Sequence, residues 1–269
     1  MDRESGTHMH SLAGRPPVVV ALDYDELDAA VQLVERLRPS RCLTSWFKVG
    51  CQLFARYGRR AVDELLKRDC RVFVDLKVNG VPDTDLSLGR SIASWGVGLV
   101  DIHLTLGKRS MERFLEGVRD CDPRPQVLGV TVLTSHSDVA TFGPDMKRET
   151  MVLWLAHLAR ESGLDGVVAA AGDVATIKRE IGQDFLVVTP GIRPRGAPSH
   201  EQRQLATPKS AADAGADFLV IGRPITQATS PCDALAQIVA EVAGTPQEGA
   251  VPGASISSEW SWPRAITAG

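Results

Sequence analysis

The chain has 269 residues, of which 43% are hydrophobic, and it carries a formal net charge of −3 at pH 7. That charge gives no electrostatic reason to expect nucleic acid or a membrane as a partner, and no apolar run approaches the ~20 residues that span a bilayer. The five cysteines are scattered without metal-ligand spacing, which predicts no metal site and indicates buried thiols in a reducing cytoplasm.

Eight short apolar runs divide the chain at nearly even intervals. They are almost continuously apolar and rich in β-branched residues, which is typical of strands buried on both faces of a parallel sheet. Between them lie segments of helical periodicity, such as DELDAAVQLVERL and ETMVLWLAHLARESG, and Thr207 followed by proline predicts one helix start. The predicted strands cover residues 17–24, 45–50, 71–77, 98–104, 126–135, 165–171, 185–191 and 217–223.

Eight strand–helix units in about 225 residues favour a (β/α)₈ TIM barrel, a single α/β domain over residues 17–243. The main alternative is an open doubly wound sheet, but no GxGxxG follows the first strand. Residues 1–16 have no secretory h-region, and GTHMH is compatible with a vector-derived remnant, so we expect a flexible N-terminal segment. Residues 244–269 mix Gly, Pro and Ser without periodicity and are expected to form a disordered tail.

Polar residues collect where the predicted strands end, which is where barrels of this kind place their active sites. A solvated strand end or a cap explains any one of them, and for His103 alone we favour that interpretation. That interpretation does not explain why two acids and two lysines gather on one rim. Burying a lysine there without an oppositely charged partner would cost free energy. We therefore predict a row Lys48–Asp75–Lys77, with the last two on one face because strand side chains alternate. The residues at the strand ends are Asp23, Lys48, Asp75, Lys77, His103, Thr134 and Ser135.

The segments after the seventh and eighth strands predict a phosphate site. Gly191, Gly196 and Gly222 offer backbone N–H groups, and Arg223 offers a guanidinium that can clamp a phosphate with two hydrogen bonds. The alternative is a surface arginine on a tight Gly-Arg-Pro turn. We favour phosphate binding because the glycines and the arginine occur together at the position where barrels bind phosphate.

Together these motifs resemble the orotidine 5′-monophosphate decarboxylase family. VVVALDY, KVG, DLK…VPDT, GVTVLTS, LDGVV, VTPGIRP, EQRQLATP and VIGRPIT follow one another over about residues 17–242. The resemblance implies a homodimeric barrel that converts orotidine monophosphate to UMP and CO₂ without a cofactor, with active sites shared across the dimer.

By resemblance, Lys77 donates a proton to C6, and Asp75 orients the charged row. Asp23 and Lys48 hold the ribose hydroxyls, and Thr84 reaches the ribose in the neighbouring subunit. Thr134 and Ser135 read the pyrimidine edge. The phosphate is held by Gln202, Gly222 and Arg223.

The chain departs from the family at one acid. The family signature is Asp-x-Lys-x-x-Asp, whose second aspartate enters the partner's site, and here that position is Gly80. Asn79 and Asp83 also depart from the family pattern, and we do not expect Asp83, which lies beyond a proline, to substitute for the acid. Leu104 and Leu106 stand where the family has small residues, and we expect them to narrow or dry part of the site.

Three interpretations stay open on these residues. The first is an orotidine monophosphate decarboxylase with an altered or weakened site. The second is a diverged enzyme on the same scaffold that acts on another pyrimidine-like nucleotide or sugar phosphate. The third is a non-catalytic nucleotide-binding protein.

Overall fold

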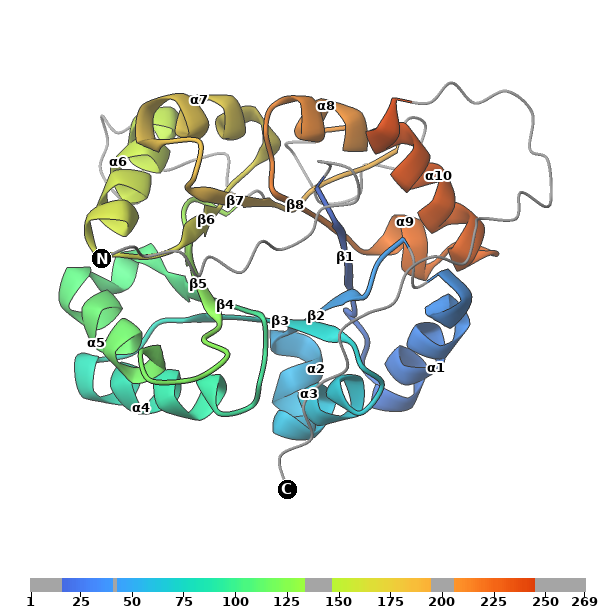
Figure 1. The fold of residues 1–269 in the computed structure, drawn as a ribbon, viewed down its shortest axis with the longest axis horizontal. Helices are drawn as coiled ribbons and strands as arrows, with labels where there is room; N and C mark the ends of the chain where they lie inside the picture. Colours follow the sequence, from blue (N-terminus) through green and yellow to red (C-terminus); the bar gives the residue numbers. More distant parts are fainter. Residues whose placement is uncertain (1–15, 41–42, 134–146, 195–205, 245–269) are drawn as a thin grey trace, which may run out of the picture.

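In the computed structural model, residues 16–40, 43–133, 147–194 and 206–244 are described. Eight parallel strands within these ranges pair in chain order, and β8 closes against β1 to complete a barrel. Helices surround the strands on the outside (Figure 1). The predicted (β/α)₈ barrel is therefore confirmed. The segments predicted to be flexible at the two ends of the chain fall mainly outside the described residues.

Seven of the strands are shorter than the apolar runs that predicted them, because several of those runs extend into the following loops, whereas β3 is one residue longer than its run. They are β1 (Val18–Ala21), β2 (Trp46–Gly50), β3 (Arg71–Val78), β4 (Leu99–His103), β5 (Gln126–Val130), β6 (Gly166–Val168), β7 (Leu186–Thr189) and β8 (Phe218–Ile221). The helices are α1 (Leu27–Leu37), α2 (Cys51–Tyr57), α3 (Arg59–Leu66), α4 (Pro82–Ala93), α5 (Lys108–Val118), α6 (Arg148–Glu161), α7 (Ala171–Ile181), α8 (Pro208–Asp213), α9 (Arg223–Thr226) and α10 (Pro231–Ala243). Two 3₁₀ turns are η2 (Arg38–Ser40) and η3 (Leu104–Leu106).

Each strand buries both of its faces, which explains the continuous apolar runs. One face belongs to a cluster inside the barrel, where the Trp46 ring meets Phe218 edge-on at 5.3 Å between centroids. The other face packs against the surrounding helices in a larger cluster. These aromatic rings occupy the interior of the barrel, so its core is packed rather than open.

The local signals for helix starts are visible in the structure. Thr207 precedes α8, and its hydroxyl accepts a hydrogen bond from the Ser210 N–H at 3.1 Å, as the Thr-Pro pair predicted. Among the described residues, no helix combines the length and the apolar character that crossing a membrane requires.

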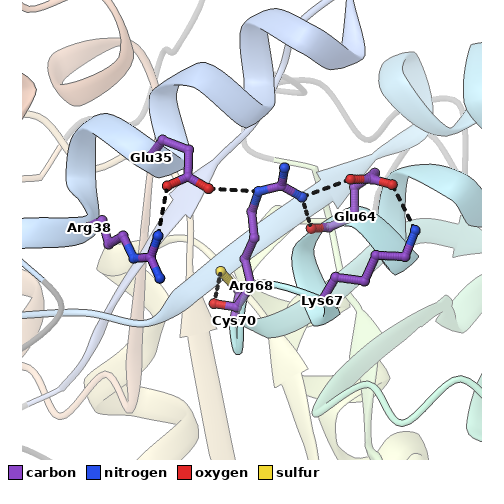
Figure 2. Close-up of polar contacts among 6 residues, drawn as sticks. All are labelled: Glu35, Arg38, Glu64, Lys67, Arg68 and Cys70. Atoms are coloured by element: carbon purple, nitrogen blue, oxygen red, sulfur yellow. Dashed lines mark hydrogen bonds and ion pairs between the residues drawn. The ribbon is translucent and has the colours of Figure 1, made fainter.

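Arg68 joins α1 to the end of α3 on the outer surface (Figure 2). Its guanidinium lies 2.9 Å from Oε1 of Glu35 and 2.7 Å from Oε2 of Glu64, and it also bonds the Glu64 carbonyl. Glu35 pairs in turn with Arg38, and Glu64 pairs with Lys67. Solvent screens such pairs, so each contributes little by itself, but the network holds the turn that leads into β3.

The four cysteines in the described residues are free thiols, but they are not uniformly buried. Cys70 is buried, whereas Cys51 is exposed. The expectation of buried thiols is wrong for Cys51 because this residue begins α2 at the open end of the barrel. Its sulfur lies 3.5 Å from the Leu76 carbonyl.

Candidate active site

A pocket of about 720 Å³ opens at the carboxyl ends of the strands. Phe73 and Val220, from the interior cluster, line it. Charged residues that follow or belong to β1, β2 and β3 line one part, and Val130 and Val168 on β5 and β6 give another part an apolar surface. The pocket therefore combines an apolar wall with a fixed set of charges, which is typical of a small-molecule site.

Four charged side chains form a continuous row across the first three strands. The Lys48 Nζ lies 3.0 Å from Oδ1 of Asp23 and 2.9 Å from Oδ2 of Asp75. The other oxygen of Asp75 contacts the Nζ of Lys77. Asp75 thus lies between two ammonium groups, and Lys77 ends the row in the pocket.

The pKa shifts of Lys48, Asp75 and Lys77 keep these three groups charged at neutral pH. Burial lowers the pKa of Lys48, but the charges of Asp75 and Asp23 outweigh burial, and the pKa lies well above its ordinary value. Burial likewise opposes the shift of Asp75, but Lys48, a hydrogen bond with Asp101, and Lys77 together lower its pKa well below the usual range. Burial lowers the pKa of Lys77, but the charge of Asp75 outweighs burial, and the pKa lies above its ordinary value.

A bulge in β3 presents Lys77 to the pocket. Val74 pairs with Val100 on β4, whereas Val78 pairs with Ile102, so four steps along β3 match two steps along β4. Lys77 lies within the bulge and has φ = +48°, a left-handed conformation that is rare for residues other than glycine. Simple alternation placed this lysine on the same face as the acid two residues earlier. Both do line the pocket, but the irregular strand is what sets the direction of Lys77.

Asp101, a residue that sequence reasoning missed, accepts a hydrogen bond from the bulge. Asp101 lies on β4, is 1% exposed, and accepts a hydrogen bond from the Lys77 N–H at 2.8 Å. In the sequence, Asp101 lies in the middle of an apolar run rather than at its end. The run predicts a buried strand, and nothing in it marks Asp101 as a site residue. The available signal was an acid flanked by Val100 and Ile102, where a buried carboxyl group requires a specific partner.

Two arginines mark another part of the pocket. Arg223 follows β8, and Arg193 follows β7 and is 8% exposed. Burial, and then the positive charge of Arg223, lower the pKa of Arg193. The Arg193 guanidinium donates to the Ile192 carbonyl at 2.8 Å, whereas its Nε has no hydrogen-bond partner among the described residues. Two neighbouring guanidiniums with an unused donor attract an anion, and the backbone at Gly191 and Gly222 lies beside them.

Sequence reasoning named Arg223 and missed Arg193, although the latter belongs to the VTPGIRP motif. In the closed barrel, β7 is four strands from β3 in either direction. The buried arginine therefore lies across the barrel mouth from Lys77, and a ligand anchored at the arginines can extend toward the ammonium group.

Residues 16–238 match the model of the orotidine 5′-phosphate decarboxylase / HUMPS family. The chain belongs to this family. The resemblance found in its motifs is thereby confirmed.

Relatives in the family cover most of the chain. The orotidine 5′-phosphate decarboxylase of Vibrio atlanticus is 43% identical over 224 residues, which are 82% of this chain and 96% of the relative. The protein of the same name from Laribacter hongkongensis is 44% identical over 229 residues, 84% of this chain and 93% of the relative. The crystal structure of orotidine 5′-phosphate decarboxylase from Lactobacillus acidophilus superposes with a TM-score of 0.74 at 33% identity, and covers 84% of this chain and 98% of that one.

Several residues named from the family pattern lie outside this pocket or outside the described residues. Thr134, Ser135, Gly196 and Gln202 fall outside the described residues. Thr84 is exposed on the first turn of α4 and does not line the pocket of its own chain. Its role across a dimer interface stays a prediction.

The leucines after β4 do not narrow the site, contrary to expectation. Leu104 is buried in the cluster between strands and helices, where it packs over Gly129 of β5. Leu106 packs against the same cluster and, like Leu104, is not among the described residues that line the pocket. The short turn η3 directs both away from the barrel mouth. His103 caps this turn, because its Nδ1 accepts a hydrogen bond from the Thr105 N–H at 3.4 Å.

Gly80 packs closely against Asp85, an acid that the sequence analysis did not place in the site. A Cβ atom at position 80 would overlap Oδ1 of Asp85. Asp85 is 0% exposed, and neither of its carboxyl oxygens has a hydrogen-bond partner among the described residues. The Asp83 side chain is 92% exposed and pairs with Arg113 on α5 at 3.2 Å, so it does not replace the missing aspartate in its own chain.

Proposed function

We propose that this protein decarboxylates orotidine 5′-monophosphate to UMP and CO₂ without a cofactor, as the printed names of its relatives suggest. The observation that carries the proposal is the ammonium group of Lys77, held by Asp75 in a pocket whose other side carries two arginines. We propose further that it acts as a cytoplasmic homodimer, in which Thr84 serves the neighbouring site.

The chemistry requires a fixed cation at the reacting carbon. When the C6–carboxylate bond breaks, its electron pair stays on C6 and CO₂ leaves. A positioned ammonium group stabilises this carbanion electrostatically and then transfers a proton to it. Lys77 has the charge for both steps because its pKa is raised by Asp75. Lys48 and Asp75 supply a rigid support, since each is buried and paired.

The phosphate group supplies binding energy far from the reacting carbon. Arg193 and Arg223, with the backbone at Gly191 and Gly222, provide charge-assisted donors for it. Such remote binding orients the substrate and favours the transition state when it is coupled to alignment at the reacting end. Asp23 and Lys48 lie between the two ends and are proposed to hold the ribose hydroxyls. We propose that Thr134 and Ser135 contact the base and that Gln202 contacts the phosphate.

A diverged reaction on another pyrimidine-like nucleotide or sugar phosphate is the second candidate. The observation that favours it is the close contact between Gly80 and Asp85, where a Cβ atom at position 80 would overlap the Asp85 carboxylate. Purified protein is mixed with orotidine monophosphate, the loss of orotate absorbance is followed, and UMP binding is measured by calorimetry. Turnover supports decarboxylation. Tight UMP binding without turnover supports the second candidate or a nucleotide-binding protein.

Restoring the family aspartate at position 80 is expected to destabilise the protein unless Asp85 is also changed. Gly80→Asp alone should destabilise the fold by about 1–3 kcal/mol, because overpacked buried sites cost that much. Asp85→Ala removes the obstructing carboxylate, so the double variant should recover most of this loss. Its destabilisation should be smaller than the sum of the destabilisations of the two single variants. Denaturant unfolding of the four proteins measures the effect.

The same set of variants tests the missing acid. If the altered site limits turnover, decarboxylation rises in the double variant and not in Gly80→Asp. Asp83→Ala, which changes an exposed acid nearby, serves as the matched control and should leave stability and turnover unchanged. Additive unfolding energies for Gly80→Asp and Asp85→Ala would show that the two positions are not coupled.

A further inference from the structure

We propose that Asp101 carries a proton in the folded protein at neutral pH and is a positioning residue for Lys77. Nothing in the family signature named above includes this residue. The positioning role rests on the proposed function of Lys77, whereas the protonation does not.

The first observation concerns the two carboxyl oxygens of Asp101, of which one has a hydrogen-bond partner and the other has none among the described residues. Its Oδ1 accepts from the Lys77 N–H, but its Oδ2 is buried without a partner among the described residues. A buried carboxylate oxygen without a donor is costly. A protonated carboxyl group is a donor instead, and the Asp75 carboxyl group lies close enough to accept from it. The two groups share one proton.

The second observation is the balance of charges around Asp101. The charged groups that act on it are Asp75 and Lys77, both on β3. On its other side the register partner is Leu128 of β5, which is apolar. Burial, the charge of Asp75 and the hydrogen bond with Asp75 all raise the pKa of Asp101, and Lys77 opposes them only partly. Two adjacent buried carboxyl groups do not both ionise, and the one with two ammonium neighbours stays charged.

A neutral Asp101 has a consequence for the reaction. Asp75 is then the single anion beside Lys77, so the charge of Lys77 is not balanced by a second carboxylate. The positive field of the Lys77 ammonium group toward the pocket is correspondingly stronger. The hydrogen bond from the Lys77 N–H replaces the strand pairing that the bulge interrupts, and so supports its left-handed backbone.

The protonation is tested by the pH dependence of stability. Folding takes up a proton when the folded pKa of an acid exceeds its unfolded value of about 4. The stability from the neutral group is fully present below that pH and is lost as the pH rises toward the folded pKa. Asparagine keeps the acceptor for Lys77 and the donor for Asp75 but does not titrate. Between about pH 5 and 7, the folding equilibrium constant of the wild type should therefore fall about tenfold per pH unit relative to Asp101→Asn.

Infrared difference spectra between these two proteins supply a second measurement. The carbonyl stretch of a protonated carboxylic acid should be present in the wild type at pH 7 and absent in Asp101→Asn. The protonation would be overturned if the ratio of the two folding equilibrium constants, wild type to Asp101→Asn, stayed constant above pH 5. Absence of the infrared band would overturn it as well. Neither measurement requires turnover, so failure of the proposed decarboxylation leaves them unaffected.

The positioning role is tested with Asp101→Ala beside Asp101→Asn. The alanine variant should lower kcat by about 10²-fold, the cost of a misplaced group of this kind, with UMP affinity changed less than about threefold. Asp101→Asn should restore kcat. A crystal structure of Asp101→Ala should show the backbone of Lys77 outside the left-handed region. Retention of that conformation would overturn the positioning role whether or not the protein decarboxylates orotidine monophosphate.

Discussion

Lys77→Met is expected to lower the kcat for orotidine monophosphate by at least about 10³-fold, since it removes both the electrostatic stabiliser and the proton donor. UMP affinity should change by less than about tenfold, because UMP has no carboxylate at C6 and its phosphate binds elsewhere. Methionine keeps most of the volume of the side chain, so a loss of packing does not account for the effect. The measurement is the loss of orotate absorbance together with calorimetric binding of UMP.

The matched control is Lys108→Met, which removes an exposed lysine at the start of α5. It should leave kcat within about twofold of the wild type, as expected for a surface substitution away from the site. Equal losses of kcat in the two variants, or a Lys77→Met enzyme that turns over normally, would remove this ammonium group from the mechanism. Thermal unfolding of both variants separates an effect on chemistry from one on folding.

Arg223→Ala is expected to weaken UMP binding by about 10- to 150-fold. This range follows from the loss of about 1.5–3 kcal/mol, the contribution of a hydrogen bond to a charged group. Uridine lacks the phosphate, so its weaker affinity should change by less than about twofold. Arg193→Ala should show the same selectivity, because its guanidinium faces the same part of the pocket. Calorimetry with UMP and uridine measures each variant.

Arg109→Ala, at an exposed position on α5, is the control for a general loss of positive charge. It should leave both ligands unaffected. If Arg223→Ala weakened UMP and uridine equally, the arginine would contact the nucleoside or support the fold, and the phosphate would lie elsewhere.

The barrel and the charged row could be predicted from the sequence because both depend on local patterns. Continuous apolar runs such as 71–77 are stable only where both strand faces are buried, and eight of them separated by amphipathic segments form a closed barrel. The ends of parallel strands meet at one rim. Lys48 on β2 therefore meets Asp75 on the neighbouring β3, and Asp75 also meets Lys77 on its own strand.

Three features of the site were decided only by the tertiary structure. Asp101 reaches the Lys77 N–H because β3 contains a bulge. A bulge shifts the register between two strands, and the pattern of apolar and polar residues along either strand does not reveal that shift. Arg193 acquires its significance from burial beside Arg223, which lies 30 residues further along the chain and on another strand end. Asp85, near the start of α4, lies against Gly80 in the loop that precedes the helix. Each contact depends on the three-dimensional course of the backbone, and periodicity along one segment carries no information about it.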